Sequence, residues 1–411
     1  MDSASGETTV PWGDPQFRVV VASTLAGVLG VTLVTPIVPL LPAVLGVTDS
    51  TASLLITAYT LPGVFFSPVA GVLADRHGRR RVLVWSLLCF SLGGVAVLLA
   101  GEFTTVLLLR GVQGMGASGL FAVAVTLIGD TYEGVQRNAA LGANGAAISV
   151  GAAVYPLFGG AIATLGWKAP FAVYAVGSLV ALWALRAVED VPVENPAGGF
   201  AYVRGALHAL PVGAAVSLYG TAIVTFVLLF GGVFTAIPFL LARAFTGPVT
   251  VGGVSLAPSA LIGVVLTTNA LTTAVVASRS GPLAARYTNR ELLVFGLAAY
   301  GLGLVVGWAG GTPAWLTLGV LVVGAGQGLI LPPLDASVSD LAPRRYRAGS
   351  LSLRTSAAWL GTTIGPVLFT TLATVTGYRL LLLGGGLGAF AVASVLSRTG
   401  PSRWVGPVDA D

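Results

Sequence analysis

Twelve long apolar runs dominate the sequence, and they constrain the fold more than any other feature. Only 9% of the 411 residues are charged, against about 25% in a soluble domain, and 55% are hydrophobic. A surface that faces water would need more charged residues than this chain has. Most of its surface must therefore face lipid. A membrane-crossing helix needs roughly 20 mostly apolar residues. We therefore predict an all-α integral membrane protein with twelve spans, at residues 17–41, 51–74, 81–101, 105–128, 138–164, 168–188, 207–241, 254–278, 291–310, 314–338, 347–375 and 378–397.

Residues suited to catalysis or metal binding are scarce. Cys89 is the only cysteine, which excludes an internal disulfide and a cysteine-based metal site, and there are only two histidines, His77 and His208. The sequence has no GxxxxGK[ST] loop, so energy must come from a gradient. The net charge of +5 comes from short basic clusters between apolar runs, which suits an inner membrane surface better than a nucleic acid. We therefore expect no enzyme activity, no cofactor, no metal and no nucleic-acid partner.

The basic residues predict the orientation in the membrane. With the N-terminus inside, 17 of the 21 Lys and Arg residues fall in inner segments, and the other four are Arg110, Lys168, Arg243 and Arg379. Because basic residues collect on the cytoplasmic side, we expect a multi-pass protein of the cell membrane with both termini in the cytoplasm. The first run is not expected to be a cleaved signal, because residues 1–16 carry three acids and no base.

The sequence repeats itself when it is shifted by 210 residues. Arg76 then falls on Arg286, and Asp130 falls on Asp340. Chance matches at charged loop residues are rare in a chain so poor in charge, so we predict two six-helix halves. Since six is even, both halves have the same orientation, and parallel halves frame a central cavity in one class of transporters. The predicted segments are a first half at residues 1–188, a cytoplasmic linker at residues 189–206, and a second half with a short tail at residues 207–411.

Four segments resemble the signatures of one transporter family. Residues 71–81, GVLADRHGRRR, closely resemble the loop 2–3 signature of the major facilitator superfamily, and residues 109–116, LRGVQGMG, resemble its fourth-helix motif. Residues 151–160, GAAVYPLFGG, resemble its fifth-helix antiporter motif, with Tyr155 where a second glycine is usual. Residues 29–39, LGVTLVTPIVP, are similar to the first-helix motif of the twelve-span drug:proton antiporters. The resemblance covers the whole chain and implies two pseudo-symmetric six-helix halves around a central cavity.

The loop 2–3 signature implies a conformational latch. Asp75 is expected at the C-terminal end of the second helix, where the helix dipole disfavours an anion. The resemblance implies that it meets the start of the eleventh helix, near Arg347, while the cytoplasmic side is closed, and Arg79 could pair with Asp130. The alternative is that these arginines only set the topology. The expected latch residues are Gly71, Asp75, Arg76, Gly78, Arg79, Arg80, Asp130 and Arg347.

A second group of residues is expected to couple transport to protons. Arg110 lies inside the fourth span, where a charge costs at least ~2.5 kcal/mol, so it should face the bundle interior and be paired. The resemblance gives it a role in proton coupling, with Gln113 one turn away; the alternative is a hydrogen-bond anchor between helices. Asp335 is the one carboxylate clearly inside the apolar band, and Arg354 lies at a similar depth. The two could pair, either for proton coupling or as a static buried pair.

The family architecture implies a cavity lined by helices 1, 4, 7 and 10. On the seventh span, four aromatic residues recur at spacings of 7, 4 and 4, which puts them on one helix face. An aromatic face suits lipophilic or cationic solutes, and it also suits lipid contact or core packing. The expected cavity residues are Thr32, Thr35, Tyr219, Phe226, Phe230, Phe234 and Gln327.

The fifth span is expected to pack closely against a neighbouring helix. Gly151, Pro156, Gly159 and Gly160 give it a smooth, bent face, and small residues let helix backbones approach each other. The resemblance implies the leak-resistant packing of an exporter, and the alternative is ordinary helix packing.

These features favour a secondary transporter that works by alternating access. Its expected activity is proton-coupled efflux of small lipophilic or cationic compounds, and its expected partners are the small-molecule substrate, protons and membrane lipid, with the protein a monomer. One alternative is a sugar or metabolite importer of the same fold, which would carry more polar residues in its cavity. Another is a non-transporting sensor or scaffold, which would need no mobile latch.

Overall fold

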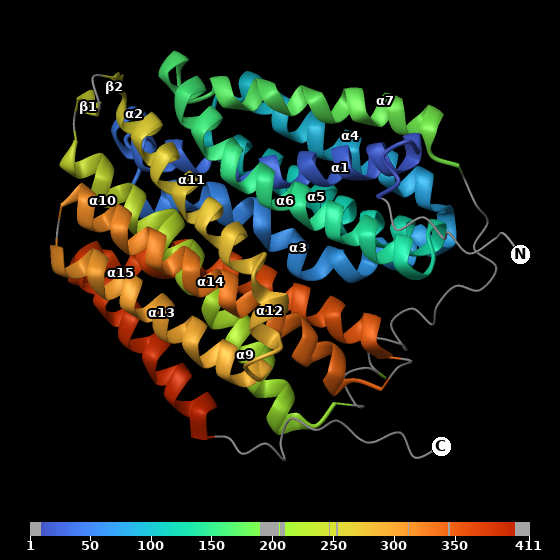
Figure 1. Ribbon diagram of the computed structural model, residues 1–411. Coiled ribbons are helices and arrows are strands. Elements are labelled where there is room, and N and C mark those ends of the chain that lie inside the picture. Colours follow the sequence, from blue (N-terminus) through green and yellow to red (C-terminus); the bar gives the residue numbers. More distant parts are fainter. Residues whose placement is uncertain are drawn as a thin grey trace, which may run out of the picture.

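The molecule is almost entirely helical, and its two halves lie one above the other in Figure 1, with the first half in blue to green. The computed structural model describes residues 10–189, 205, 210–245, 247–251, 254–310, 312–343 and 346–398. Of the predicted linker at residues 189–206, only Glu189 and Gly205 belong to the described residues.

The first half contains six membrane-crossing segments. The first crossing is broken after Thr32, because Pro36 and Pro39 have no N–H to donate and the chain tightens into a 3-10 turn. Asp14 caps its start by accepting a hydrogen bond from the backbone N–H of Gln16 at 2.8 Å. The elements are α1 (Pro15–Thr32), η1 (Thr35–Leu40), α2 (Leu41–Leu45), α3 (Asp49–His77), α4 (Arg79–Val95), η2 (Ala96–Leu99), α5 (Phe103–Thr131), α6 (Gly134–Ile162), η3 (Ala163–Leu165), η4 (Ala169–Ala175) and α7 (Val176–Ala187).

The second half differs from the sequence expectation at two places. The predicted seventh helix contains a π-helical stretch, and the predicted eighth helix begins only at Pro258, a residue that suits the first turn of a helix. Before it, two short strands pair antiparallel, with Val249 opposite Leu256. The elements are α9 (Val212–Leu228), η5 (Leu229–Ala236), α10 (Ile237–Ala244), β1 (Val249–Val251), β2 (Val254–Leu256), α11 (Pro258–Ala277), α12 (Ser280–Ala284), α13 (Asn289–Gly310), α14 (Pro313–Leu341) and α15 (Arg347–Arg398).

The helices account for the twelve predicted spans. Within the described residues, ten helices are long and apolar enough to cross a membrane, and α3 makes eleven when its two arms, bent by 56°, count as one span. The last of these, at Gly349–Arg398, has 50 residues, which at 1.5 Å per residue is far longer than a bilayer of about 30 Å. It turns back at Gly377, whose φ of 76° is left-handed, so α15 consists of two spans.

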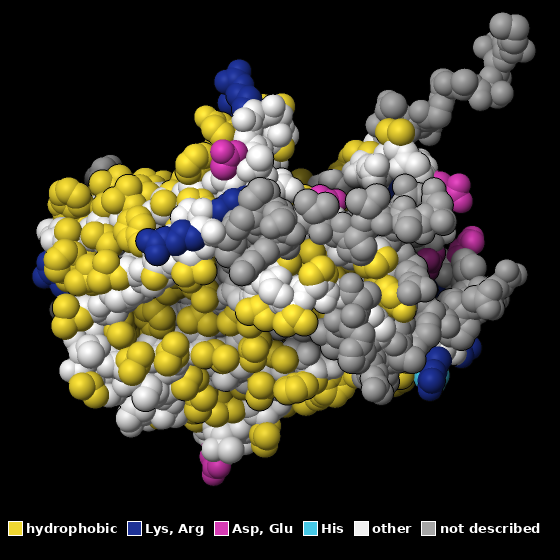
Figure 2. All heavy atoms as spheres, turned by 90° about the horizontal axis from the view of Figure 1, so that it is seen from below, with side chains coloured by type: hydrophobic (Ala, Val, Ile, Leu, Met, Phe, Trp, Pro, Cys, Tyr) yellow, Lys and Arg dark blue, Asp and Glu magenta, His cyan; other side chains and the backbone are white. Residues whose placement is uncertain are grey.

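The outer surface suits lipid. Figure 2 shows the molecule from below, where hydrophobic side chains cover most of the described surface and charged groups lie mainly near its margins. Large side chains on the second half stay exposed, among them Phe295 and Leu302 on α13 and Leu387 on α15. A contiguous apolar surface of this extent is unusual for a protein in water. The chain is a multi-pass membrane protein.

Two ends of the bundle can be distinguished by their charges. We call the end at which α3 meets α4, next to Arg76, Arg79 and Arg80, the basic end. We call the opposite end, where β1 and β2 lie on the left of Figure 1, the distal end; Asp49 and Arg243 belong to it.

Candidate functional site

A ladder of hydroxyl groups joins the two halves between α3 and α15. Ser53 and Thr370 are linked through their hydroxyls at 3.1 Å. Thr57 donates to the backbone carbonyl of Thr363 at 3.0 Å, and the Thr363 hydroxyl donates to Thr60 at 3.0 Å. All five residues lie in the part of each helix nearer the distal end.

A charged cluster, which we call the distal latch, closes the same interface at its outer edge. Asp49 at the start of α3 accepts a hydrogen bond from Arg243 Nη2 at 2.5 Å and another from the hydroxyl of Tyr378 at 2.8 Å. The Arg243 guanidinium also lies 5.0 Å from the centroid of the Tyr378 ring. Asp49 belongs to the first half and its two partners to the second, so the cluster can persist only while the distal ends are together.

The second contact between the halves joins α6 to α11. A Cβ added to Gly160 would lie 2.3 Å from the carbonyl oxygen of Ser259, and one added to Gly263 would lie 2.3 Å from that of Pro156. The Ser259 hydroxyl donates to the carbonyl of Gly160 at 2.8 Å. Gly159 packs equally closely against the first half, since an added Cβ would lie 1.9 Å from the Leu33 carbonyl oxygen. The close packing predicted for this helix is confirmed.

The same helices leave glycines without neighbours near the basic end. A Cβ added to Gly71 on α3, or to Gly142 or Gly145 on α6, would meet no described atom within 4 Å. The hydrogen bonds that join α3 to α10 and α15, and those that join α6 to α11, lie distal to these positions. The distal end is therefore closed, and the small-residue surfaces of α3 and α6 are unused toward the basic end.

Loop 2–3 is held within the first half. Gly78 joins α3 to α4 with a φ of 92°, which favours glycine. Arg79, which is buried, donates from Nε to Asp130 Oδ2 at 2.9 Å and forms an ion pair with Asp75. The Arg79–Asp130 pair predicted from the sequence is present.

The other expected latch residues are not brought together here. Arg76 and Arg347 are exposed and Arg80 is half-buried, while Gly71 faces open space. Asp75 pairs with Arg79 and not with Arg347. The approach of Asp75 to the start of α15 therefore stays a prediction for a conformation with a closed basic end.

A further cluster at the basic end fixes the beginning of α1. The Tyr132 hydroxyl donates to Asp14, and the Gln16 amide donates to the Thr131 hydroxyl at 2.7 Å and accepts from the backbone N–H of Glu189 at 3.1 Å. Burial raises the pKa of the Tyr132 phenol, and the hydrogen bond to Asp14 and its charge raise it further. The phenol therefore stays a donor at neutral pH.

Arg110 is fully buried and is surrounded by oxygen atoms of three helices. It donates from Nη1 to Gln113 Oε1 at 2.6 Å, from Nη2 to the Gly30 carbonyl at 2.7 Å and from Nε to the Leu55 carbonyl at 3.1 Å. Its guanidinium carbon lies 4.4 Å from the centroid of the Tyr59 ring. The prediction that Arg110 faces the bundle interior and is paired is confirmed. Among the described residues its partners include no carboxylate, which matches the hydrogen-bond anchor.

The break in the first span explains why the Gly30 carbonyl is available. Ahead of Pro36 the helix tightens, and the backbone N–H of Val34 bonds to the carbonyl of Val31 at 3.2 Å instead of to that of Gly30. The hydroxyl of Tyr174 donates to the same Gly30 oxygen at 3.2 Å. The first-helix and fourth-helix motifs therefore meet at one backbone carbonyl.

Asp335 and Arg354 form the ion pair expected in the second half. Arg354 Nη2 lies 2.5 Å from Asp335 Oδ1. The side chain of Asp335 is 48% exposed, whereas that of Arg354 is 14% exposed, so the carboxylate can be reached from outside the protein. The pair lies in the part of α14 and α15 nearer the basic end, where the halves have no hydroxyl ladder.

Several residues expected to line the cavity are buried instead. Thr32 is 8% exposed and Thr35 is 0% exposed, and their hydroxyls donate to the carbonyls of Val28 at 2.7 Å and Val31 at 2.9 Å. A hydroxyl that donates to a carbonyl of its own helix needs no hydrogen bond from a solute. In this conformation both threonines are packing residues, and their place in a substrate cavity stays a prediction.

Two further cavity candidates have protein partners in the second half. Gln327 is 8% exposed and accepts from the Thr273 hydroxyl at 3.3 Å. The Tyr219 hydroxyl donates to the carbonyl of Ser350 at 3.2 Å. Gln327 packs between α14 and α11, and its place in a substrate cavity also stays a prediction.

The aromatic face of the seventh span packs against α15. A Cβ added to Gly361 on α15 would lie 2.8 Å from the Cβ of Phe226. One added to Gly365 would lie 3.3 Å from the Cβ of Phe230. Phe230 stacks on Phe234 with 5.0 Å between ring centroids, and Phe234 is buried. Of the two interpretations left open by the sequence, the contacts match core packing.

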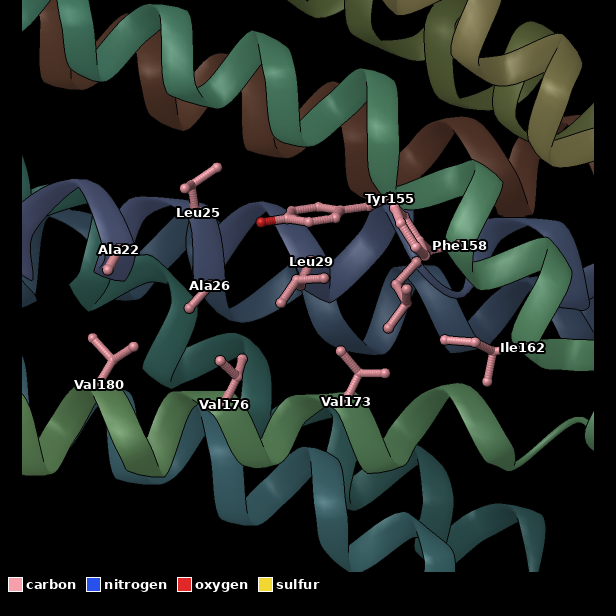
Figure 3. Close-up of a pocket in the computed structure, with 11 residues that line it drawn as sticks. Ala22, Leu25, Ala26, Leu29, Tyr155, Phe158, Ile162, Val173, Val176 and Val180 are labelled. Carbon is pink, nitrogen blue, oxygen red and sulfur yellow. The ribbon is translucent and has the colours of Figure 1, made fainter.

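A cavity not expected from the sequence lies on the side of the first half. It has a volume of about 340 Å³ and is lined by side chains of α1, α6, η4 and α7. In Figure 3, Leu29 from α1 faces Val173 and Val176, while Leu25 points to the side on which the ring of Tyr155 lies. Every lining residue except Tyr155 is apolar. In the sequence, the only sign of this cavity was Tyr155, which stands where the antiporter motif usually has a glycine.

The fold and these contacts define a membrane protein of two six-helix halves joined at one end. The chain belongs to the Major Facilitator Superfamily, whose family model matches residues 20–266 and 222–407.

Relatives of this chain include an exporter and a resistance protein. It is 24% identical to the bacillibactin exporter of Bacillus subtilis (strain 168), over 82% of this chain and 85% of the relative. It is 29% identical to the class C tetracycline resistance protein of Escherichia coli, over 79% of this chain and 81% of the relative.

Solved structures share the fold at low sequence identity. A POT family transporter in complex with 5-aminolevulinic acid gives a TM-score of 0.80 at 13% identity, covering 94% of this chain and 96% of that one. A bacterial homologue of the human lysosomal transporter Spinster, in an inward-facing and occupied conformation, gives 0.74 at 17% identity, covering 95% and 98%.

Proposed function

We propose that this protein is a proton-coupled efflux transporter of the cell membrane that exports small lipophilic or cationic compounds by alternating access. The distribution of contacts between the halves carries this proposal. The hydroxyl ladder and the distal latch join the halves toward the distal end, whereas Gly71, Gly142 and Gly145 on the same two interface helices meet no atom of the described residues. Surfaces of the same kind at both ends of one interface suit two alternating closed states.

The orientation that we propose for the chain places this conformation in the transport cycle. With both termini in the cytoplasm, the basic end faces the cytoplasm, and this structure is the inward-facing state that takes up substrate. The matched halves are residues 1–188 and 207–411, and a monomer contains the complete pathway. The bacillibactin exporter and the tetracycline resistance protein, which are similar over most of their length, support export.

We propose Asp335 as the proton carrier. It is a half-exposed carboxylate within a membrane span, and its partner Arg354 belongs to the same half, so the pair does not have to break when the halves move. Intramembrane carboxylates commonly mark proton pathways. Arg110 and Gln113 support transport indirectly. Their hydrogen bonds join helices of the first half and keep that half rigid.

The test is transport into proteoliposomes with an imposed pH gradient. Ethidium, tetracycline and glucose are offered in turn, and protein-free liposomes measure the trapping of weak bases. An antiporter accumulates ethidium or tetracycline when the lumen is acidic. Glucose uptake driven by an acidic exterior would instead establish an importer, and the absence of any protein-dependent flux would establish a non-transporting protein.

The Asp335→Asn variant tests the proton carrier in the same vesicles. It should lose uptake driven by the gradient but keep the exchange of labelled for unlabelled substrate, because exchange needs no net proton movement. Glu291→Gln is the matched control, since Glu291 caps α13 through Thr288 at the protein surface. Full gradient-driven uptake by Asp335→Asn would refute the assignment.

A further inference from the structure

The side cavity of the first half opens toward lipid and not toward the other half. On α6, Ala153, Pro156 and Gly160 contact α11. The lining residues Tyr155 and Ile162 each follow one of these contact residues by two positions, which at 100° per residue turns them about 200° away. The cavity is therefore on the face of α6 opposite the interface.

The rim of the cavity supports the same placement. Phe158 on α6 is 56% exposed and Val176 on α7 is 37% exposed, and both line the cavity. Both residues lie within membrane-crossing helices. Their exposed surface faces hydrocarbon, so a molecule dissolved in the bilayer can reach the cavity without passing through water.

One polar group lies inside this apolar cavity. The hydroxyl of Tyr155 makes no hydrogen bond with the described residues, and Figure 3 shows its oxygen directed between Leu25 and Leu29. Leu29 lies close to the middle of the first span, Pro15–Leu45. A hydroxyl in hydrocarbon without an acceptor is unfavourable, so an occupant that offers an acceptor gains affinity.

The depth of the hydroxyl selects between two kinds of occupant. The ester carbonyls of a phospholipid lie at the interface, about 15 Å from the midplane of a hydrocarbon core about 30 Å thick. A phospholipid tail at the midplane therefore offers no acceptor to Tyr155. A lipophilic solute that carries a carbonyl or ether oxygen does.

We propose that this cavity, between α1, α6 and α7, binds lipophilic molecules that carry a hydrogen-bond acceptor and takes them directly from the bilayer. The site rests on the proposed function, because it supplies the exporter with compounds dissolved in the membrane. Apolar side chains hold the body of the molecule, and the Tyr155 hydroxyl donates to its oxygen. The volume of about 340 Å³ is at the lower end of the range for small-molecule sites.

Photolabelling with benzophenone tests the site. Benzophenone has two rings and a carbonyl acceptor, partitions into bilayers, and on irradiation forms a bond to a nearby C–H carbon that peptide mass spectrometry can locate. Wild-type protein in liposomes without any gradient should be labelled on the α1, α6 and α7 residues of the cavity. Tyr155→Phe, which removes one oxygen atom, should lower this labelling about two- to tenfold.

Two further variants control for folding and for position. Ala26→Trp fills the cavity from α1 and should abolish the labelling. Leu179→Trp adds the same ring on α7 at a residue that is 66% exposed and does not line the cavity, so it should leave the labelling unchanged. If Ala26→Trp does not insert into the membrane, the comparison of cavity labelling between the wild type and Tyr155→Phe still tests the proposal.

Competition isolates the hydrogen bond. Dicyclohexyl ketone should compete about two- to tenfold better than dicyclohexylmethane in the wild type, and the two should compete equally in Tyr155→Phe. Equal competition in the wild type, or cavity labelling no higher than in Ala26→Trp, would overturn the proposal; the second result would mean that a lipid tail fills the space.

The labelling result is independent of transport. Vesicles that transport but show no cavity labelling refute only this site. Vesicles that are labelled but show no gradient-driven flux refute only the exporter.

Discussion

At the scale of single residues, Arg110 illustrates how a membrane protein accommodates a buried charge. A guanidinium without a carboxylate is compensated here by two backbone carbonyls, one amide oxygen and the face of an aromatic ring. Each of these groups comes from a different turn of α1, α3 or α5. The residue therefore joins three helices, and its loss should affect stability before it affects transport.

Arg110→Met should destabilise the protein by at least about 2 kcal/mol, because it leaves the buried carbonyls of Gly30 and Leu55 and the Gln113 amide without their donor. The measurement is denaturant unfolding in detergent, alongside transport. A variant of normal stability that loses only its dependence on the pH gradient would instead assign Arg110 to the proton pathway.

Asp335→Asn and Arg354→Gln should be coupled, since the two side chains touch within one half. A double-mutant cycle on unfolding free energy should give an interaction of at least about 0.5 kcal/mol. Additive effects would mean that the contact contributes nothing to stability.

The residue contacts also separate what the sequence could and could not predict. Arg79–Asp130, Asp335–Arg354 and the burial of Arg110 were predictable, because a charge in an apolar run must find a partner. The distal latch was not, since its partners come from opposite halves and meet in one conformation only.

The surroundings of the expected cavity residues could not be predicted for a different reason. Helical periodicity put Phe226 and Phe230 on one face but could not say which helix that face meets, and the neighbour is α15. For Thr32 and Thr35, the proline break directs the hydroxyls to their own backbone.

At the scale of helices, α3 and α6 carry two sets of glycines with opposite expected roles. Those in the middle or distal part of the helix, such as Gly63 and Gly160, have atoms of the other half within 3 Å of an added Cβ. Those near the basic end, such as Gly71 and Gly145, have none within 4 Å among the described residues. Bulk at the two ends should therefore shift the conformational equilibrium in opposite directions.

Gly145→Leu should fold normally and favour the closed distal end, and Gly160→Ala should disfavour it, because its added Cβ meets the Ser259 carbonyl at 2.3 Å. Spin labels on cysteines at Thr164 and Leu380, in a Cys89→Ala background, report the separation of the distal ends of the two halves. Equal distances in both variants would contradict the proposal that the two sets alternate.

At the scale of the whole molecule, the interface between the two halves is buried along the hydroxyl ladder and partly exposed at the distal latch. The polar part of the described interface includes the hydroxyl ladder, the distal latch and the hydrogen bonds from α11 to α6, and Arg243 in the latch is 58% exposed. Exposed ion pairs contribute little, typically about 0.2–1 kcal/mol. The distal latch by itself therefore adds little to the stability of the closed distal end, as the proposed alternating cycle requires.

Asp49→Asn should shift the population toward an open distal end by about two- to fivefold, the equivalent of a latch worth about 0.5–1 kcal/mol. The same pair of spin labels gives the populations. Glu102→Gln changes a charge at the same end, outside the distal latch, and should leave them unchanged. A shift in the Glu102 variant as large as in the Asp49 variant would show that net charge, and not the latch, controls the equilibrium. High salt should reduce the difference between wild type and Asp49→Asn.

The anchoring of Arg110 has a consequence for how this chain can change over generations. Two of its partners are main-chain oxygens, those of Gly30 and Leu55, so Arg110 uses no side chain of α1. Gly30 itself is constrained, because an added Cβ would lie 1.9 Å from the Tyr59 hydroxyl oxygen. Side chains elsewhere along α1, including those on the lipid-side cavity, can therefore be exchanged without removing the acceptor that Arg110 needs. Substitutions on α1 can therefore change which substrates are bound while the contact between Arg110 and its acceptors remains. We expect the amino-acid sequence of α1 to vary more among relatives than that of α5.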